Sequence, residues 1–197
     1  MFWLIISVLL WGVIHSLLAS LRAKELALAW FGAQAMRFYR LFYNAFAILS
    51  FLPILAIAAL TSSGILYDVP FPWSGLMILG EILALLGLAY TFIQTDAWEF
   101  LGLRQLGESA GPAQLKTGGL YRYVRHPLYA MGLAIIWLFP YMTVTILVLN
   151  AALTIYILIG AIFEERKLRR EFGQEYIEYA AGTPMLIPFL KRKKIRI

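Results

Sequence analysis

The chain has 197 residues, of which 61% are hydrophobic and only 14% are charged. Its long apolar runs exceed what a soluble domain of this size can bury in one core, so we expect the lipid bilayer to be its solvent. The formal net charge of +6 comes from basic residues beside apolar segments, which favours anionic lipid over nucleic acid as a partner. Because cysteine is absent, disulfides, thiolate nucleophiles and cysteine-ligated metal sites are excluded.

The sequence predicts an all-α membrane bundle of about five transmembrane helices, since a spanning helix needs about 20 mostly apolar residues. The first three helices are expected at residues 2–21, 41–60 and 73–95. The apolar run 127–163 is broken at Phe139-Pro140-Tyr141, where proline interrupts the helical hydrogen-bond ladder. We therefore expect the two halves of this run to form a helical hairpin, segments four and five.

Polar stretches separate or follow these segments. Residues 22–40 are expected to form a loop, and residues 96–125 a long loop or interfacial segment. The latter is punctuated by Gly102, Gly107, Gly111, Pro112, Gly118 and Gly119. From Glu164 onward, charged residues alternate with apolar ones at helical spacing, which indicates an amphipathic helix leaving the membrane and ending near Gly182.

The distribution of basic residues predicts the orientation of the chain, because lysine and arginine stay on the cytoplasmic side. They occur in residues 22–40, in the stretch before Pro127 and after Glu164, but not in residues 62–72 or near Pro140. We therefore expect the N-terminus outside and the C-terminus in the cytoplasm.

A run of glycines, basic residues and aromatics precedes the fourth segment. It reads Gly118-Gly119-Leu120-Tyr121-Arg122-Tyr123-Val124-Arg125-His126-Pro127-Leu128-Tyr129. Pro127 suits the first turn of a helix, where free backbone amides favour an anion such as a carboxylate beside His126. Alternatively, Arg122 and Arg125 hold lipid phosphates while the tyrosines form an interfacial aromatic belt.

Two adjacent acids, Glu164 and Glu165, end the fifth apolar segment. The helix dipole disfavours acids at a helix C-terminus. Consecutive helical positions point about 100° apart, so one of the two can face the bundle and do chemical work. The alternative is a solvated charge run in which the acids pair with neighbouring basic residues along the helix face.

The order of these motifs is specific. Gly-Leu-Tyr, Arg125-His126-Pro127-x-Tyr129, an apolar hairpin, Glu164-Glu165 and Glu171-Phe172-Gly173-x-x-Tyr176-x-x-Tyr179 follow one another. Over residues 116–188 the chain thereby resembles the isoprenylcysteine carboxyl methyltransferase and phospholipid methyltransferase superfamily of membrane enzymes. The resemblance implies an S-adenosylmethionine site between the His-Pro-x-Tyr entry and the paired glutamates, open toward the cytoplasm, without a Rossmann domain or a metal.

Carried over residue by residue, the resemblance implies a set of cofactor-binding residues. These are Gly119, Tyr121, His126, Pro127, Tyr129, Glu164 and Glu165. Carboxylates on one wall and His or Arg on the other complement the sulfonium, ammonium and carboxylate groups of the cofactor. Arg125, Arg40 and His15 are the candidate catalytic residues. If the acceptor is a thiol, nearby Arg40, Arg125 or His126 would favour its nucleophilic thiolate form.

The N-terminal half carries polar residues where plain spans are apolar. His15-Ser16-Leu17-Leu18-Ala19 and Tyr39-Arg40-Leu41-Phe42-Tyr43-Asn44 are similar to elements of the branch that contains methanethiol S-methyltransferases and membrane proteins associated with nitrite and nitric oxide reductases. We expect His15, Arg40, Asn44 and Gln94 to line an acceptor pocket. The alternative for His15 is a hydrogen-bonding role between packed helices.

The sequence thus predicts one membrane domain over residues 1–197, with residues 1–95 as scaffold and acceptor side and 96–197 as cofactor-binding core. The expected function is S-adenosylmethionine-dependent methyl transfer to a small or lipophilic acceptor, a thiol or a carboxylate. Phospholipid N-methylation and a non-enzymatic membrane subunit are the alternatives. The sequence leaves the oligomeric state and the role of Glu81 open.

Overall fold

The computed structural model describes residues 1–107 and 114–188 of the chain. Its contacts divide it into two compact units, each built from three stretches of sequence. Unit 1 comprises Met1–Leu66, Asp96–Pro112 and Met142–Leu153, and unit 2 comprises Tyr67–Thr95, Ala113–Tyr141 and Thr154–Ile197. The expected division of a single membrane domain after residue 95 stays a prediction.

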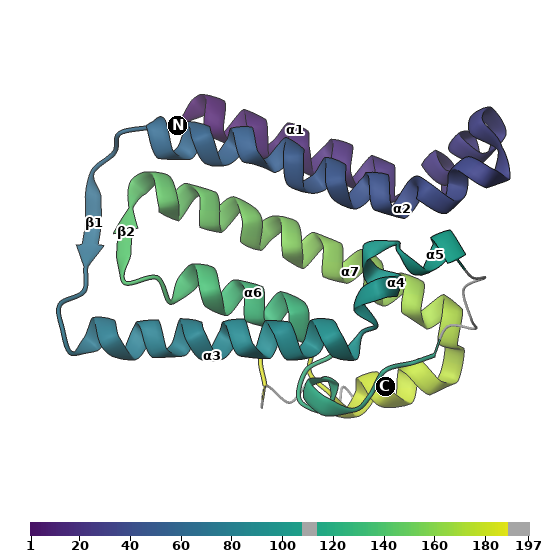
Figure 1. The fold of residues 1–197 in the computed structure, drawn as a ribbon. Helices are drawn as coiled ribbons and strands as arrows, with labels where there is room; N and C mark the ends of the chain where they lie inside the picture. The colour runs from purple at the N-terminus through teal and green to yellow at the C-terminus, as the bar shows by residue number, and fades with distance from the viewer. Residues whose placement is uncertain (108–113, 189–197) are drawn as a thin grey trace, which may run out of the picture. The chain divides into compact units, whose positions relative to one another are not determined.

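The described chain is almost wholly helical (Figure 1), which confirms the predicted all-α class. The elements are α1 (Phe2–Ala19), α2 (Leu21–Leu60), β1 (Ile65–Asp68), α3 (Trp73–Gln94), α4 (Ala97–Leu101), α5 (Arg104–Gly107), the 3-10 helix η1 (Gly119–Arg122), α6 (Pro127–Trp137), β2 (Tyr141–Thr143) and α7 (Val144–Gly182). Among the described residues, α1, α2, α3 and α7 are long and apolar enough to cross a membrane, whereas α6 is shorter. Large apolar side chains such as Trp3, Leu60 and Leu86 lie exposed on these helices, as lipid contact requires. The chain is an integral membrane protein.

The predicted loop at residues 22–40 is wrong, because this stretch is part of α2. Ser20 caps the helix, and its hydroxyl accepts a hydrogen bond from the Ala23 amide at 3.2 Å. The stretch is rich in alanine, leucine, lysine and glutamate, which favour helix. Its charges mark where the apolar run ends rather than where the helical backbone ends. The single interruption inside α2 is Gly32, with φ of 76°.

The predicted break between segments four and five is confirmed, since α6 and α7 are separated around Pro140. The short strand β2 that follows the break pairs with β1, and neither strand was predicted. The predicted amphipathic helix is continuous with the apolar part of α7 and ends at Gly182, as expected. Inside it, Gly173 has non-helical angles (φ 54°, ψ −125°), which bend the chain. Gly111 and Pro112 lie outside the described residues.

The core of unit 1 packs α1 against α2. Leu4, Val8, Ile54 and Leu149 form its buried apolar cluster. The Trp11 indole nitrogen donates hydrogen bonds to the Ser50 hydroxyl at 3.1 Å and to the Ala47 carbonyl at 3.3 Å. Within hydrocarbon such polar contacts link helices that apolar burial alone does not hold together.

The stretch that contains α4 and α5 docks on α2 in the same unit. The Asn44 amide donates to the carbonyls of Phe100 at 2.9 Å and Leu101 at 3.1 Å, at the end of α4. The Arg37 guanidinium likewise donates to the carbonyls of Gln105, at 3.1 Å, and Leu106. These donors satisfy carbonyls that a helix end leaves without intrahelical partners. The first part of the loop or interfacial segment expected at residues 96–125 is therefore anchored to α2.

In unit 2, α6 lies along α3 (Figure 1) through a stripe of small residues. Gly80, Ala84, Gly87 and Thr91 recur at helical spacing on α3, and Ala84 and Thr91 are buried. A Cβ at Gly80 would lie 2.9 Å from a Leu138 methyl, and one at Gly87 would lie 2.8 Å from the sulfur of Met131. Small residues thus allow the close helix approach that is typical of membrane bundles. This packing holds the start of α6, where the candidate site lies, against the end of α3.

Candidate active site

The carboxylate of Glu165 is the centre of a buried polar network in unit 2. Its Oε1 accepts hydrogen bonds from Arg125 Nε at 2.7 Å, His126 Nε2 at 2.9 Å and the Tyr176 hydroxyl at 2.7 Å. Its Oε2 accepts from Arg125 Nη2 at 3.0 Å. Arg125, His126, Glu165 and Tyr176 are each at most 7% exposed. The sequence motifs around residues 125, 165 and 176 therefore meet at one carboxylate.

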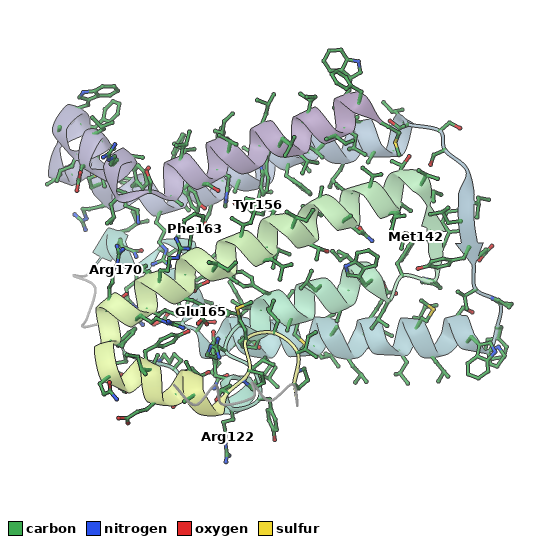
Figure 2. The ribbon with its side chains drawn as sticks, turned by 180° about the vertical axis from the view of Figure 1, so that it is seen from behind. Arg122, Met142, Tyr156, Phe163, Glu165 and Arg170 are labelled. Atoms are coloured by element: carbon green, nitrogen blue, oxygen red, sulfur yellow. The ribbon has the colours of Figure 1, made fainter. Side chains whose placement is uncertain are left out.

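The local sequence explains why Arg125 and His126 lie together at this point. Proline at position 127 starts α6, because its fixed φ suits the first helical position and its missing amide is not needed there. His126 is the N-cap in a non-helical conformation, as the sequence predicted. On α7, Glu165 lies on the side that faces the part of the helix after Gly173 (Figure 2). The bend at Gly173 brings Tyr176 back toward it.

The Nη1 group of Arg125 binds backbone carbonyls. It donates to the Ala180 carbonyl at 3.1 Å and to the Thr183 carbonyl. With its two bonds to Glu165, the guanidinium makes four hydrogen bonds while fully buried. A buried ion pair is favourable only when further hydrogen bonds satisfy both partners, and this pair meets that condition.

Glu164 lies beside this network but has a different environment. Its side chain is 41% exposed. Its Oε2 accepts a hydrogen bond from the Tyr129 hydroxyl at 2.8 Å and lies 3.6 Å from His126 Nδ1. The sequence left open which of the two acids faces the bundle. The structure buries Glu165 among protein donors and leaves Glu164 partly accessible to a ligand.

The hydrogen bonds of His126 indicate its neutral tautomer and favour its protonation. A carboxylate only accepts, so the Nε2 atom that contacts Glu165 carries a hydrogen and Nδ1 faces Glu164. Burial by itself lowers the pKa of His126, but the hydrogen bonds and negative charges of Glu164 and Glu165 outweigh it and raise the pKa above 6.5. The ring also stacks on Tyr129, with centroids 5.4 Å apart.

A second group of predicted residues gathers where α3 ends. Gly119, with φ of 59°, lies so close to Gln94 that a Cβ would overlap the Gln94 amide. Within the described part of the chain, the Oε1 atom of Gln94 is buried and accepts no hydrogen bond. Tyr121 belongs to the same group: burial chiefly raises the pKa of its phenol, a hydrogen bond with Thr95 opposes that shift, and the charge of Glu164 adds to it. Gln94 thus lies beside predicted cofactor residues.

The structure places the other predicted acceptor residues in unit 1. The His15 ring stacks on Trp11, with centroids 4.8 Å apart, and its Nδ1 lies 3.2 Å from the Tyr43 hydroxyl. Arg40 lies where Gly102, at φ of 88°, packs directly on the α2 backbone. Asn44 uses its amide donors on the end of α4. These contacts match the helix-packing alternative for His15, and a role in acceptor binding stays a prediction for all three residues.

Comparisons with known proteins identify the family of this chain. The family model for phospholipid methyltransferases matches residues 75–175, slightly more than half of the chain. The chain belongs to the phospholipid methyltransferase family. No solved structure matches it significantly.

The chain is also similar to proteins named methanethiol S-methyltransferase. Methanethiol S-methyltransferase of Crocosphaera subtropica is 37% identical over 123 residues, which cover 60% of this chain and 47% of that protein. Methanethiol S-methyltransferase 1 of Bradyrhizobium diazoefficiens is 41% identical over 104 residues, 50% of this chain and 36% of that protein. The Mycobacterium tuberculosis protein of the same name is 34% identical over 110 residues, 53% and 45% of the two chains. The matches span at most about half of the length of these relatives.

Sequence reasoning missed part of this candidate site. Tyr176 and Tyr179 were noted as motif residues but given no role, because their spacing also fits the apolar face of an amphipathic helix. The Tyr179 hydroxyl donates to the Tyr121 carbonyl at 2.6 Å. The carbonyls of Ala180 and Thr183 also take part, and backbone acceptors leave no signal in a sequence.

The raised pKa of His126 predicts a pH-dependent contribution to stability. A histidine whose folded-state pKa exceeds its unfolded value of about 6.5 stabilises the fold fully below that value, and the contribution is lost as pH rises through the folded-state pKa. The difference in free energy of unfolding between the wild type and His126→Gln should therefore be larger at about pH 6 than at about pH 9. Thermal unfolding of the purified protein in detergent measures it. A difference that grows with pH would contradict the assignment.

Proposed function

We propose that the chain is an S-adenosylmethionine-dependent methyltransferase that methylates a small or lipophilic thiol. The observation that carries this proposal is the partly exposed carboxylate of Glu164. It is held by Tyr129 and His126 next to a Glu165 whose own charge is already neutralised by Arg125. Membership of the phospholipid methyltransferase family supports a methyl-transfer reaction for such a site.

The residues present fit the proposed cofactor. Glu164 offers a negative charge to the ammonium group or the ribose hydroxyls. The Oε1 atom of Gln94 is buried without a donor, which is costly unless a ligand supplies one. An amino or hydroxyl group of the nucleoside would supply that hydrogen. His126, protonated more readily than an ordinary histidine, has its Nδ1 on the Glu164 side, where it can donate to a carboxylate of the ligand.

The proposed roles of the two buried charged residues differ from those of the ligand-facing ones. Arg125 and Glu165 form their hydrogen bonds with each other and with other groups of the protein. We therefore assign them to positioning His126, and we assign Glu164, His126, Tyr129 and Gln94 to the cofactor. Gly119 gives Gln94 room, and Pro127 starts the helix that carries Tyr129.

When bound, S-adenosylmethionine supplies a methyl group on a positively charged sulfur, which an acceptor attacks in line. The chain contributes alignment of the two reactants and exclusion of water. For a thiol acceptor, the net change is one new S–C bond on the acceptor, loss of the sulfonium S–C bond and release of the thiol proton. His15 and Arg40 are the proposed residues that favour the thiolate, and Asn44 is proposed to help bind the acceptor.

The relatives, rather than the geometry, support the proposed class of acceptor. Several similar proteins are named methanethiol S-methyltransferase, which favours a small thiol. A carboxylate remains an alternative acceptor, and a lipid amine is the alternative suggested by the name of the family. The distribution of basic residues supports the proposal that the site and the C-terminus lie on the cytoplasmic side, from which a charged cofactor would arrive.

Methyl transfer tests the proposal directly. The purified full chain, incubated with methyl-labelled S-adenosylmethionine and, separately, methanethiol, a prenylcysteine and phosphatidylethanolamine, should label the thiol as a volatile thioether. Glu164→Gln removes a charge from the ligand-facing acid, and we expect its affinity for the cofactor to fall about tenfold or more. Mass spectrometry and calorimetry measure product and affinity. A wild type that binds no cofactor would exclude the enzyme and favour a non-enzymatic subunit.

The substitution Gln94→Met separates ligand binding from folding. Methionine has a similar size but lacks the unpaired buried acceptor, so the stability of the chain should stay the same or rise. Affinity for S-adenosylmethionine should fall about three- to tenfold, because one hydrogen bond to the ligand is lost. Unfolding midpoints and binding constants are compared with the wild type. Loss of stability with unchanged affinity would show that Gln94 has a structural role only.

A further inference from the structure

The residues that follow the family match form one wall of the polar network. The match to the family ends at residue 175. Residues 176–185, which we name the C-terminal strap, comprise the end of α7 and the turn after it. Tyr176, Thr183 and Leu186 are buried in or beside this segment, which lies beyond the apolar part of α7.

The strap binds the backbone of the Arg-His pair. The Arg125 amide donates to the Pro184 carbonyl at 2.9 Å, and the His126 amide donates to the Met185 carbonyl at 3.1 Å. His126 precedes the first residue of α6, so these amides lie at a helix start and have no intrahelical acceptor. The strap thus supplies partners that the helix itself lacks.

The strap also binds the side chains of the network. The Tyr176 hydroxyl donates to the same Glu165 oxygen that His126 contacts, and the Tyr176 side chain is 1% exposed. Arg125 reaches the carbonyls of Ala180 and Thr183. The strap therefore binds both the main chain of Arg125 and His126 and the side chains of Arg125 and Glu165. A carboxylate oxygen that accepts three hydrogen bonds has little freedom to rotate.

We propose that the C-terminal strap is a positioning element of the cofactor site, and that Tyr176 fixes the orientation and hydrogen bonding of His126 through Glu165. The charged and titratable groups that face His126 or its partner are Glu164, Glu165, Arg125, Tyr129, Tyr176 and, at 3.9 Å from Glu165, Arg169. The positioning itself does not depend on which ligand binds. Its consequence for affinity rests on the proposed function.

The chain has only two histidines, one in each unit, which makes nuclear magnetic resonance of labelled histidine a clean test. In the wild type without ligand, neutral His126 should be the tautomer protonated at Nε2. Tyr176→Phe removes one donor from Glu165, so the carboxylate holds the His126 proton more strongly. The His126 titration midpoint should rise by about half a pH unit or more, while the His15 signals stay unchanged.

Tyr123→Phe is the matched control, because it removes a tyrosine hydroxyl from a side chain that is 58% exposed on the neighbouring turn. It should leave both histidines as in the wild type. Arg125→Lys is the second test variant, because lysine cannot reproduce the bidentate pair with Glu165 or both contacts with the strap carbonyls. It should also perturb His126 and not His15. An unchanged His126 titration in Tyr176→Phe overturns the proposal.

Cofactor affinity gives an independent readout of the same variants. Tyr176→Phe should weaken S-adenosylmethionine binding about three- to tenfold, and Tyr123→Phe should not. Should the wild type bind no cofactor, the proposed function fails while the histidine spectra still decide whether the strap positions His126. A weakened affinity with an unchanged His126 titration would also count against positioning through Glu165.

Discussion

A buried carboxylate must be neutralised and hydrogen-bonded, and Glu165 is the group on which the second unit depends. Removing such a charge from water costs several kcal/mol, so it is stable only where donors are fixed around it. Here the donors are Arg125 and His126, just before α6, and Tyr176 of the strap, and the strap carbonyls accept further hydrogen bonds from Arg125. One charge therefore links the residues just before α6 to α7 and to the strap that follows its bend.

Glu165 is surrounded by hydrogen-bond donors from the protein, which explains why the two adjacent acids have different environments. Consecutive residues of a helix point in different directions, and only Glu165 points into the network. Glu164 then remains at the edge, held by Tyr129 and close to the far side of the His126 ring. The proposed cofactor site has to be rigid and still accessible to its ligand. The pair provides rigidity from one acid and accessibility from the other.

Much of the fold was predictable because it follows from composition and from proline. Apolar runs located α1, α3 and the apolar part of α7, and Pro127 located the start of α6. The helix at residues 22–40 does not follow from charge alone, because basic residues next to an apolar run also suit a loop. The residue types of this stretch nevertheless favour helix. The meeting of Gln94 with Gly119 depends on how α3 packs, and no spacing along the chain indicates it.

The site was predictable in its parts but not in its arrangement. The order of the Arg-His-Pro, Glu-Glu and Tyr motifs indicated that they belong together, and the network of Arg125, His126, Glu165 and Tyr176 agrees with that. The sequence did not distinguish the two glutamates, since helical periodicity alone does not say which side of α7 meets other segments. The contribution of the strap rests on backbone carbonyls, which every residue carries.

Unfolding of the two matched isosteric variants tests the central role of Glu165 most directly. Glu165→Gln leaves Arg125 as a buried cation without its counter-charge, so it should lower the free energy of unfolding by about 3–5 kcal/mol. Glu164→Gln changes a partly exposed acid and should lower it by less than about 1 kcal/mol. Equal losses in the two variants, or a larger loss for Glu164→Gln, would contradict the account.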